Sequence, residues 1–114
     1  LTHKTFEQTV KGKEKPCVVN FKSDDCHHCI RLEPEINTLN KEYESFYNFY
    51  RIDVDSEPEA QEFLDTFGDG GVPSIFIYRG DGFTEIPWED DYSYEYLKAY
   101  LKKYLENHEI ISQD

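Results

Sequence analysis

The sequence predicts an α/β fold, a mixed sheet of four to five strands with helices on both faces. Short β-prone runs alternate with longer segments of helical periodicity, in the order α-β-α-β-α-β-β-α. The first two strands are joined through a long helix, so they should be parallel with a right-handed crossover. The last two strands flank the turn Gly80-Asp81-Gly82, which makes them an antiparallel hairpin.

The first part of the chain should hold a helix, a buried strand and a second helix. Residues 2–10 are predicted to be helical, because their apolar residues recur at helical spacing. Residues 17–21 form an apolar, β-prone run that is typical of a central strand. A second helix is predicted over about residues 26–44 by the 3–4 spacing of Cys29, Leu32, Ile36, Leu39 and Tyr43. Pro34 should kink this helix, because proline removes one backbone hydrogen bond.

The middle of the chain repeats the alternation. Residues 46–54 are predicted to form the second strand. Ser56-Glu57-Pro58 is a helix-start signal, with Ser56 as the expected cap and Pro58 in the first turn. The apolar face of the helix that follows is expected to consist of Ala60, Phe63, Leu64 and Phe67.

Two strands and a helix complete the predicted fold. Residues 74–78 and 83–88 are the strands of the hairpin, and Ser93 should cap the last helix. The buried face of that helix is expected to consist of Tyr94, Leu97, Leu101, Tyr104 and Leu105. Trp88 and the tyrosines of this helix are expected in the core or at its rim, rather than in a binding site.

Size and charge restrict the classes of function. With 114 residues the chain should be one domain, residues 1–114. Its 24 acidic and 12 basic residues give a net charge of -12, which disfavours nucleic acids and anionic membranes as partners. No apolar run approaches the length of about 18 residues that a membrane span needs. The main interpretation of this charge is that it keeps the chain soluble. The alternative, which is more specific, is that it attracts basic substrates.

The segment Cys26-His27-His28-Cys29 carries the chemistry. It follows the first predicted strand and begins a helix, where backbone N–H groups and the helix dipole favour a thiolate on Cys26. Cys29 lies one turn further along the same face, so the two sulfurs can cycle between dithiol and disulfide. A metal or iron–sulfur site that bridges two chains, and an inactive relic of a redox site, are the alternatives. Cys17 stands apart and is predicted to be a small buried hydrophobic residue.

These features together resemble the thioredoxin superfamily, and within it the catalytic domains of protein disulfide isomerases. Val19-Asn20-Phe21 and the Cys-His-His-Cys segment match the strand and active site of that family in register. His28 matches a histidine that the isomerases carry, whereas His27 replaces their glycine. The resemblance covers nearly the whole chain and implies a thioredoxin-like fold.

The same resemblance extends to the segment before the third strand. Residues 67–74 match the approach to the cis-proline of the family without gaps. It implies that the Val72–Pro73 peptide bond is cis and that the proline ring packs beside the disulfide. The backbone of Val72 should then pair with an extended substrate.

Three features depart from the family pattern, and one of them is the loop before the proline, where Asp69 and Gly70 stand in place of the bulkier residues common in the family. The family usually carries a tryptophan where this chain has Asp25, just before the first cysteine. It usually carries a buried carboxylate on the preceding strand, where this chain has Asn20. We expect Asp25 to affect substrate binding and Asn20 to affect the redox chemistry.

The sequence therefore predicts a thiol–disulfide oxidoreductase that acts on cysteines of other proteins, without a cofactor or a metal. Cys26 is the expected nucleophile and Cys29 the resolving thiol. His27 and His28, when protonated, should stabilise the Cys26 thiolate and give the pair an oxidising, isomerase-like poise. Asp24 and Asp25 should act in the opposite direction by like-charge repulsion.

Partners and location are less defined by the sequence. We expect cysteine-containing protein substrates, an unidentified recycling redox partner and a monomeric chain. The lumen of the endoplasmic reticulum or another secretory compartment is expected, with the cytoplasm as the alternative. The competing function is a peptide-binding or chaperone-like module of low turnover, which the departures at Asn20 and Asp25 favour. Among enzymes, the function closest to the predicted oxidoreductase is that of a thioredoxin-like reductant.

Overall fold

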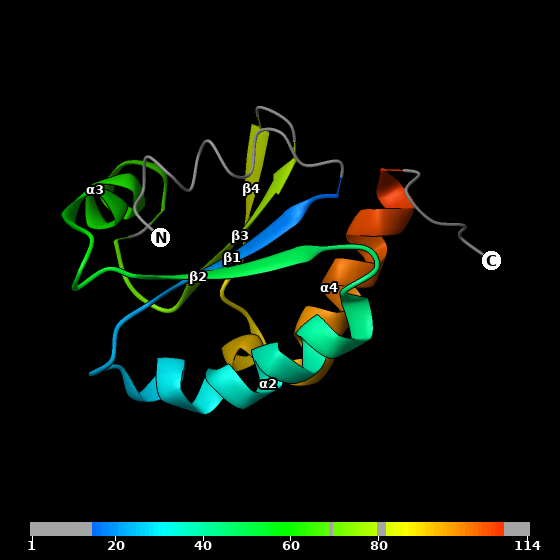
Figure 1. Cartoon of the computed structure of the whole chain (residues 1–114), viewed down its shortest axis with the longest axis horizontal. Helices are drawn as coiled ribbons and strands as arrows, with labels where there is room; N and C mark the ends of the chain where they lie inside the picture. The colour runs from blue at the N-terminus through cyan, green and yellow to red at the C-terminus, as the bar shows by residue number, and fades with distance from the viewer. Residues whose placement is uncertain (1–14, 69, 80–81, 109–114) are drawn as a thin grey trace.

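The structure is a computed structural model that describes residues 15–68, 70–79 and 82–108. The predicted helix over residues 2–10 and the first two residues of the predicted turn lie outside these ranges. The described elements are β1 (Cys17–Lys22), α2 (His27–Tyr43), β2 (Asn48–Asp53), α3 (Pro58–Phe67), β3 (Ser74–Arg79), β4 (Gly82–Ile86), the 3₁₀ turn η1 (Asp90–Tyr92) and α4 (Tyr94–Asn107), as Figure 1 shows. Their order agrees with the prediction, apart from η1, which the sequence did not indicate.

The strands form one mixed four-stranded sheet in the order β2-β1-β3-β4. β1 and β2 are parallel, with Val19 opposite Tyr50. β1 and β3 are antiparallel, with Val19 opposite Phe76, and β3 and β4 form the antiparallel hairpin. The predicted parallel pair and hairpin are thus confirmed, and β1 is a central strand.

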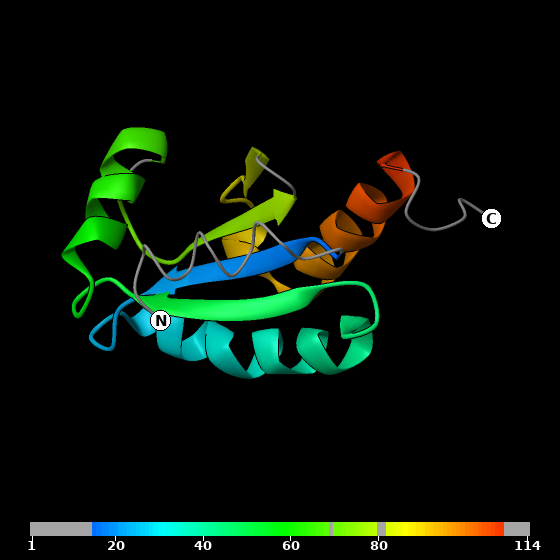
Figure 2. The ribbon, with the colours of Figure 1, turned by 45° about the horizontal axis from the view of Figure 1, so that its top comes forward.

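Helices cover both faces of the sheet, which Figures 1 and 2 show from two directions. Successive side chains of β1 point to opposite faces. Val19 and Phe21 pack with α3, in a core of Cys17, Val19, Phe21, Ile52, Val54, Ala60, Phe63, Leu64, Phe76 and Tyr78. The opposite face packs against α2 and α4, in a core of Val18, Leu32, Leu39, Tyr47, Ile75, Ile77, Ile86, Tyr92, Leu97, Leu101, Tyr104 and Leu105. Cys17 is fully buried, as predicted.

Helix α3 begins differently from the prediction. The Ser56 N–H donates to the Asp53 carbonyl oxygen at 3.2 Å, so Ser56 closes the turn that follows β2. The N-cap residue is therefore Glu57, which makes no side-chain capping bond, and Pro58 is the first helical residue. The predicted cap at Ser56 is wrong, because Ser56 belongs to the turn after β2 and lies one residue before the N-cap.

Two further boundaries show local causes. β4 ends at Ile86 rather than at residue 88, because the next residue is Pro87, which has no N–H for the ladder. Ser93 caps α4 as predicted, since its Oγ accepts a hydrogen bond from the Tyr96 N–H at 3.2 Å. The same hydroxyl donates to a carboxylate oxygen of Asp90 at 2.8 Å, which ties α4 to η1.

Candidate active site

Cys26 lies at the junction between the loop after β1 and helix α2, where it is the N-cap residue. Its Sγ accepts a hydrogen bond from the Cys29 N–H at 3.1 Å. The Cys26 thiol also lies 3.7 Å from the Val72 carbonyl oxygen, to which it can donate. The sulfur thus sits at the positive end of a helix and against the segment before β3, although 46 residues separate the two in sequence.

Cys29 is the less accessible of the two thiols. Its side chain is 3% exposed, whereas Cys26 is half-buried, and both are reduced in the structure. Burial and a hydrogen bond with Cys26 raise the pKa of Cys29 to about 12. Cys29 therefore keeps its proton near neutral pH, and Cys26 is the sulfur that a substrate reaches first.

Asn20 occupies β1 on the face covered by α2, the helix that carries Cys29. It is 5% exposed, and its side-chain oxygen Oδ1 has no hydrogen-bond partner in the structure. A buried amide oxygen without a hydrogen-bond partner lowers the stability of the folded chain and is uncommon in proteins. Asn20 is therefore a candidate for a role other than packing. The amide has no group that titrates near neutral pH and cannot accept a proton from a thiol.

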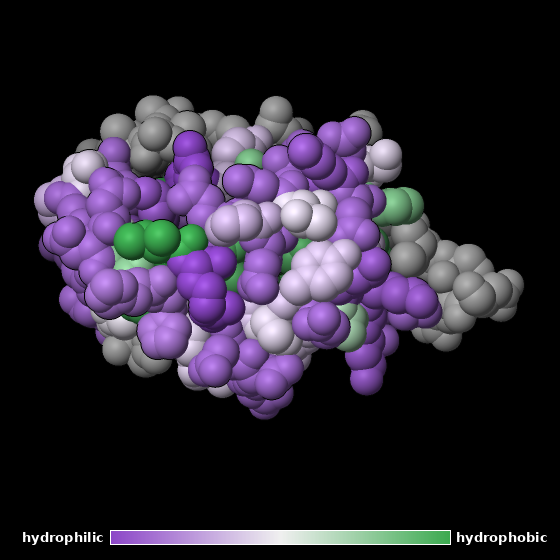
Figure 3. Space-filling model, turned by 90° about the horizontal axis from the view of Figure 1, so that it is seen from below, coloured by the Kyte–Doolittle hydropathy of each residue, from purple (hydrophilic) through white to green (hydrophobic). Residues whose placement is uncertain are grey.

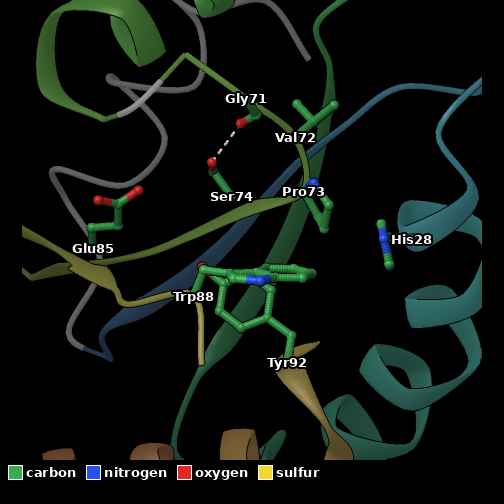
Figure 4. A pocket seen from close by; sticks show the side chains of 8 residues that line it. All are labelled: His28, Gly71, Val72, Pro73, Ser74, Glu85, Trp88 and Tyr92. Atoms are coloured by element: carbon green, nitrogen blue, oxygen red, sulfur yellow. Dashed lines mark hydrogen bonds between the residues drawn. The ribbon is translucent and has the colours of Figure 1, made fainter. Parts of the chain in front are cut away.

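A pocket of about 270 Å³ opens beside the cysteine pair. It is lined by His28, Gly71, Val72, Pro73, Ser74, Glu85, Trp88 and Tyr92 (Figure 4). The Val72–Pro73 peptide bond is cis, as the resemblance implied. The Ser74 hydroxyl donates to the Gly71 carbonyl oxygen at 2.7 Å and closes this wall of the pocket.

Trp88 and Tyr92 form the aromatic side of the pocket. Their ring centroids are 4.7 Å apart, and Trp88 is 44% exposed. The Tyr92 hydroxyl donates to the Ile86 carbonyl oxygen at 2.5 Å and lies 3.4 Å from the Ile75 N–H. Tyr92 has a φ of 54°, in the left-handed region, as do the two residues before it. This unusual turn brings the buried ring beneath Trp88.

The remaining predicted residues lie around the pocket rather than in it, apart from His28. The His28 ring packs edge-on against Trp88, with centroids 5.5 Å apart. His27 and Asp25 are exposed and do not line the pocket. Asp24 pairs with Lys22 at 2.5 Å, and this hydrogen bond lowers the pKa of its carboxyl group.

Sequence reasoning missed the contribution of Glu85 and underrated Trp88. No local pattern links either residue to the cysteines, because the hairpin of β3 and β4 brings them to the site only in the folded chain. Figure 3 shows the side of the molecule seen from below as mostly hydrophilic, with a small hydrophobic area. Ile30, next to Cys29, is 58% exposed.

The described residues contain neither a candidate metal site nor a candidate membrane span. Within residues 15–68, 70–79 and 82–108, no group of three His, Cys, Asp or Glu side chains could hold a metal ion. No helix among the described residues is long and apolar enough to cross a membrane.

Comparison with known proteins decides the family. The sequence model described as thioredoxin matches residues 1–103. This chain belongs to the thioredoxin family. The thioredoxin-family fold and the accessible–buried cysteine pair at the start of α2 support a thiol–disulfide oxidoreductase in general terms.

Individual relatives agree with this membership. The chloroplastic thioredoxin-like protein HCF164 of Arabidopsis thaliana is 35% identical over 71 residues, which are 62% of this chain and 27% of that protein. The thioredoxin of Borreliella burgdorferi is 30% identical over 64% of this chain and 60% of its own length. The thioredoxin of Rickettsia bellii is 27% identical over 69% of this chain and 72% of its own. The thioredoxin-family chain thus spans about a quarter of the chloroplastic relative.

Proposed function

We propose that this thioredoxin-family chain exchanges a Cys26–Cys29 disulfide with cysteines of protein substrates, and that it does so with an oxidising, isomerase-like poise. The observation that carries the proposal is the pairing of an accessible thiol with a buried one at a helix N-terminus, against the Val72–Pro73 segment. Such an arrangement supplies a nucleophile, a resolving group and a surface for an extended substrate.

Exchange in the reducing direction begins at Cys26. Its thiolate attacks one sulfur of a substrate disulfide, so a mixed disulfide forms while the substrate disulfide breaks. The second substrate sulfur leaves as a thiolate and takes up a proton. The Cys29 N–H and the start of α2 stabilise negative charge on Cys26 before the attack.

Resolution completes the cycle at Cys29. Its thiol loses a proton, and the resulting thiolate attacks the Cys26 sulfur of the mixed disulfide. The Cys26–Cys29 disulfide forms, and the substrate leaves as a thiol, so two electrons have passed from the chain to the substrate. The reverse sequence oxidises a substrate dithiol, and a partner that carries a dithiol or disulfide must restore the starting state.

The histidines between the cysteines support the oxidising poise. His27 and His28 lie between the two cysteines, and both side chains are exposed. A protonated imidazole near Cys26 stabilises the thiolate, and therefore the reduced form of the pair, which makes the disulfide a stronger oxidant.

Turnover of insulin disulfides by dithiothreitol or glutathione tests the activity. The chain should accelerate the reaction, and Cys26→Ser should abolish the acceleration. Cys17→Ser serves as the matched control and should retain it, because Cys17 is buried in the opposite core. Equal rates for the chain and Cys26→Ser would contradict the proposal.

A peptide-binding module of low turnover is the second candidate. Asn20 favours it, because an amide at this position cannot accept the proton of the resolving thiol. In that case peptides should bind with equal affinity to the chain and to Cys26→Ser, and no thiol-dependent rate should appear.

The compartment and partners belong to this proposal as well. An oxidising pair suits the lumen of the endoplasmic reticulum or another secretory compartment, with the cytoplasm as the alternative. The relatives named above are chloroplastic or bacterial proteins. Rapid alkylation of the protein in intact cells would report the redox state of the pair, and trapping with Cys29→Ser would recover mixed disulfides with its partners.

A further inference from the structure

Lys22, the last residue of β1, lies on the face of the sheet that α2 covers. Val18 packs in the core with α2 and α4, and side chains alternate along a strand, so Asn20 and Lys22 point to the same face as Val18. Figure 2 shows α2 running along β1 and β2. The Lys22 side chain is only 20% exposed, so its ammonium group is held close to the protein surface beside this helix.

The loop that follows Lys22 contacts both cysteines of the site. The Cys26 N–H donates to the Ser23 carbonyl oxygen at 3.3 Å. The backbone N–H of Ser23 donates to the sulfur of Cys29. Lys22 is thus the chain neighbour of the residue whose backbone meets Cys29, and its positive charge acts on that sulfur.

We propose that the Lys22 ammonium group stabilises the Cys29 thiolate while a mixed disulfide is resolved, and that Asp24 weakens this effect by pairing with Lys22. The inference rests on the proposed function, because it assigns a further residue to the same reaction. Lys22 does not touch the reacting sulfurs, so it is a positioning residue that acts through Cys29. The proton of Cys29 still leaves to water or to His28.

The resolving thiol needs such a charge. Burial foremost, and then Cys26, raise the pKa of Cys29 to about 12, so its thiolate is scarce near neutral pH. In the mixed disulfide Cys26 carries neither a charge nor a proton, so its effect on Cys29 disappears while that of Lys22 remains. Asn20, on the same face, offers no charge and no titrating group.

Lys22 keeps its own proton throughout. Carboxylates from the loop, from β2 and from α2 act on its ammonium group. Asp24 accepts a hydrogen bond from it at 2.5 Å, Asp53 lies opposite it in the β1–β2 ladder, and Glu33 belongs to α2. The bond to Asp24 foremost raises the pKa of Lys22 above its ordinary value. Lys22 is therefore a fixed positive charge between pH 6 and 9, and it cannot accept a proton from a thiol.

Asp24 is placed to modulate that charge. Its side chain is 73% exposed in the loop before α2, and its carboxylate offsets the positive charge that Cys29 experiences from Lys22. The nearby Arg51 guanidinium is engaged with Glu33 at 2.6 Å. Loss of Asp24 should therefore strengthen the field of Lys22 at Cys29, whereas loss of Lys22 leaves the Asp24 carboxylate unopposed.

The experiment measures release of a peptide thiol from its mixed disulfide with Cys26 at pH 7, by stopped flow. Lys22→Gln should slow release about fivefold, and Asp24→Asn should accelerate it about threefold, as expected for single, partly screened charges. Lys22→Arg keeps the charge and should stay within about twofold of the unaltered chain. Lys41→Gln makes the same charge change in the last turn of α2 and should leave the rate unaltered.

The two halves of the ion pair separate this role from a structural one. If the Lys22–Asp24 bond only holds the loop in place, Lys22→Gln and Asp24→Asn break the same bond and should change the rate in the same direction. Opposite directions support the inference. It is overturned by changes in the same direction, by an unaltered rate in Lys22→Gln, or by an equal effect of Lys41→Gln. Asp24 is an exposed loop residue, so Asp24→Asn decides alone if Lys22→Gln does not fold: a rate that does not increase then overturns the inference.

Alkylation of Cys29 tests the same charge without any exchange reaction. Iodoacetamide first modifies the accessible Cys26, which blocks exchange and imitates the mixed disulfide. The slower alkylation of Cys29, followed by mass spectrometry, depends on its thiolate fraction and should decrease in Lys22→Gln and increase in Asp24→Asn. If no substrate disulfide reacts, the proposed function fails, and the order of these alkylation rates still supports or overturns the role of Lys22.

Discussion

At the scale of single residues, the two cysteines of the site differ because their surroundings differ. Cys26 faces Val72 and solvent, while Cys29 is a buried residue of α2 and keeps its proton. In the proposed exchange, release of a substrate therefore depends on how Cys29 is deprotonated. Asn20, on the face of β1 that α2 covers, cannot take that proton, so water or His28 is expected to carry it.

The first prediction follows from the raised pKa of Cys29. Below this pKa the thiolate fraction rises tenfold per pH unit, so resolution of a mixed disulfide should accelerate steeply from pH 6 to 9. Asn20→Asp should resolve faster at pH 7 and show a shallower pH profile, because a carboxylate can take the proton. Stopped-flow measurement of peptide release gives both profiles.

The Asn20→Asp experiment has a matched control, and the substitution itself is expected to reduce stability. Asn37→Asp places a carboxylate on the exposed side of α2 and should leave the profile unaltered. Asn20→Asp should lower the free energy of unfolding, because it buries a carboxylate without a partner. If its resolution rates equal those of the unaltered chain at every pH, Asn20 has only a structural role.

The second prediction concerns which thiols pair. Cys17 is fully buried in the core that faces α3, whereas Cys26 and Cys29 share the start of α2 on the other side of the sheet. After oxidation, denaturation and alkylation, mass spectrometry should find the label at Cys17 alone. A peptide in which Cys17 is disulfide-linked would contradict this assignment.

At the scale of elements, the proposed function assigns the redox poise to the N-terminus of α2. The third prediction is a reduction potential of roughly -210 to -130 mV, more oxidising than the thioredoxin value of about -270 mV. Replacing both His27 and His28 by glutamine should shift the potential towards more negative values, since it removes the two imidazoles to which the proposed poise is assigned. Equilibration with glutathione buffers measures both proteins, and a potential below that of thioredoxin would show that the histidine argument is wrong.

The turn η1 is the element that supports the pocket. Three successive residues from Asp90 have φ values near 53°, a conformation that costs about 1 kcal/mol or more for each residue. The Arg31 guanidinium donates to the carbonyl oxygen of Asp91, and the Tyr92 hydroxyl donates to the carbonyl oxygen of Ile86, the last residue of β4. These contacts offset the strain and fix the aromatic wall.

The fourth prediction tests this support. Tyr92→Phe removes the hydroxyl and leaves the Ile86 carbonyl without this donor, which should lower the free energy of unfolding by about 1–3 kcal/mol. It should also alter the fluorescence of Trp88, because the ring beneath it is no longer fixed. Tyr96→Phe, whose hydroxyl bonds to Pro87 at the surface, is the control and should have the smaller effect on both.

At the scale of the whole molecule, charge opposes folding. The net charge of -12 produces self-repulsion, whereas the exposed ion pairs such as Lys98–Glu42 and Arg51–Glu33 contribute little each. The fifth prediction is that sodium chloride stabilises the chain, with a melting temperature about 4 °C higher at 300 mM than at 10 mM salt. Calorimetry checks this, and a lower melting temperature in salt would show that the ion pairs outweigh the repulsion.

Local signals account for the parts of the fold that were predicted correctly. The apolar run of β1, the periodicity of α2 and the serine before α4 each act through neighbours in sequence. The cap at Ser56 was predicted by the same kind of signal and failed, because the turn after β2 uses that serine. Pro87 ends β4 earlier than expected for an equally local reason, its missing N–H.

The sequence by itself determined the parallel strand pair, the final hairpin and the close pair of cysteines at the start of a helix, because strand patterns, helix periodicity and the two-residue spacing are local properties. Only the tertiary structure decided what surrounds that pair. Glu85 and Trp88 reach the site through the β3–β4 hairpin, and Tyr92 reaches it through a left-handed turn. Side chains that meet across the sheet leave no spacing in the sequence, since their contact depends on the register of strands and the path of turns.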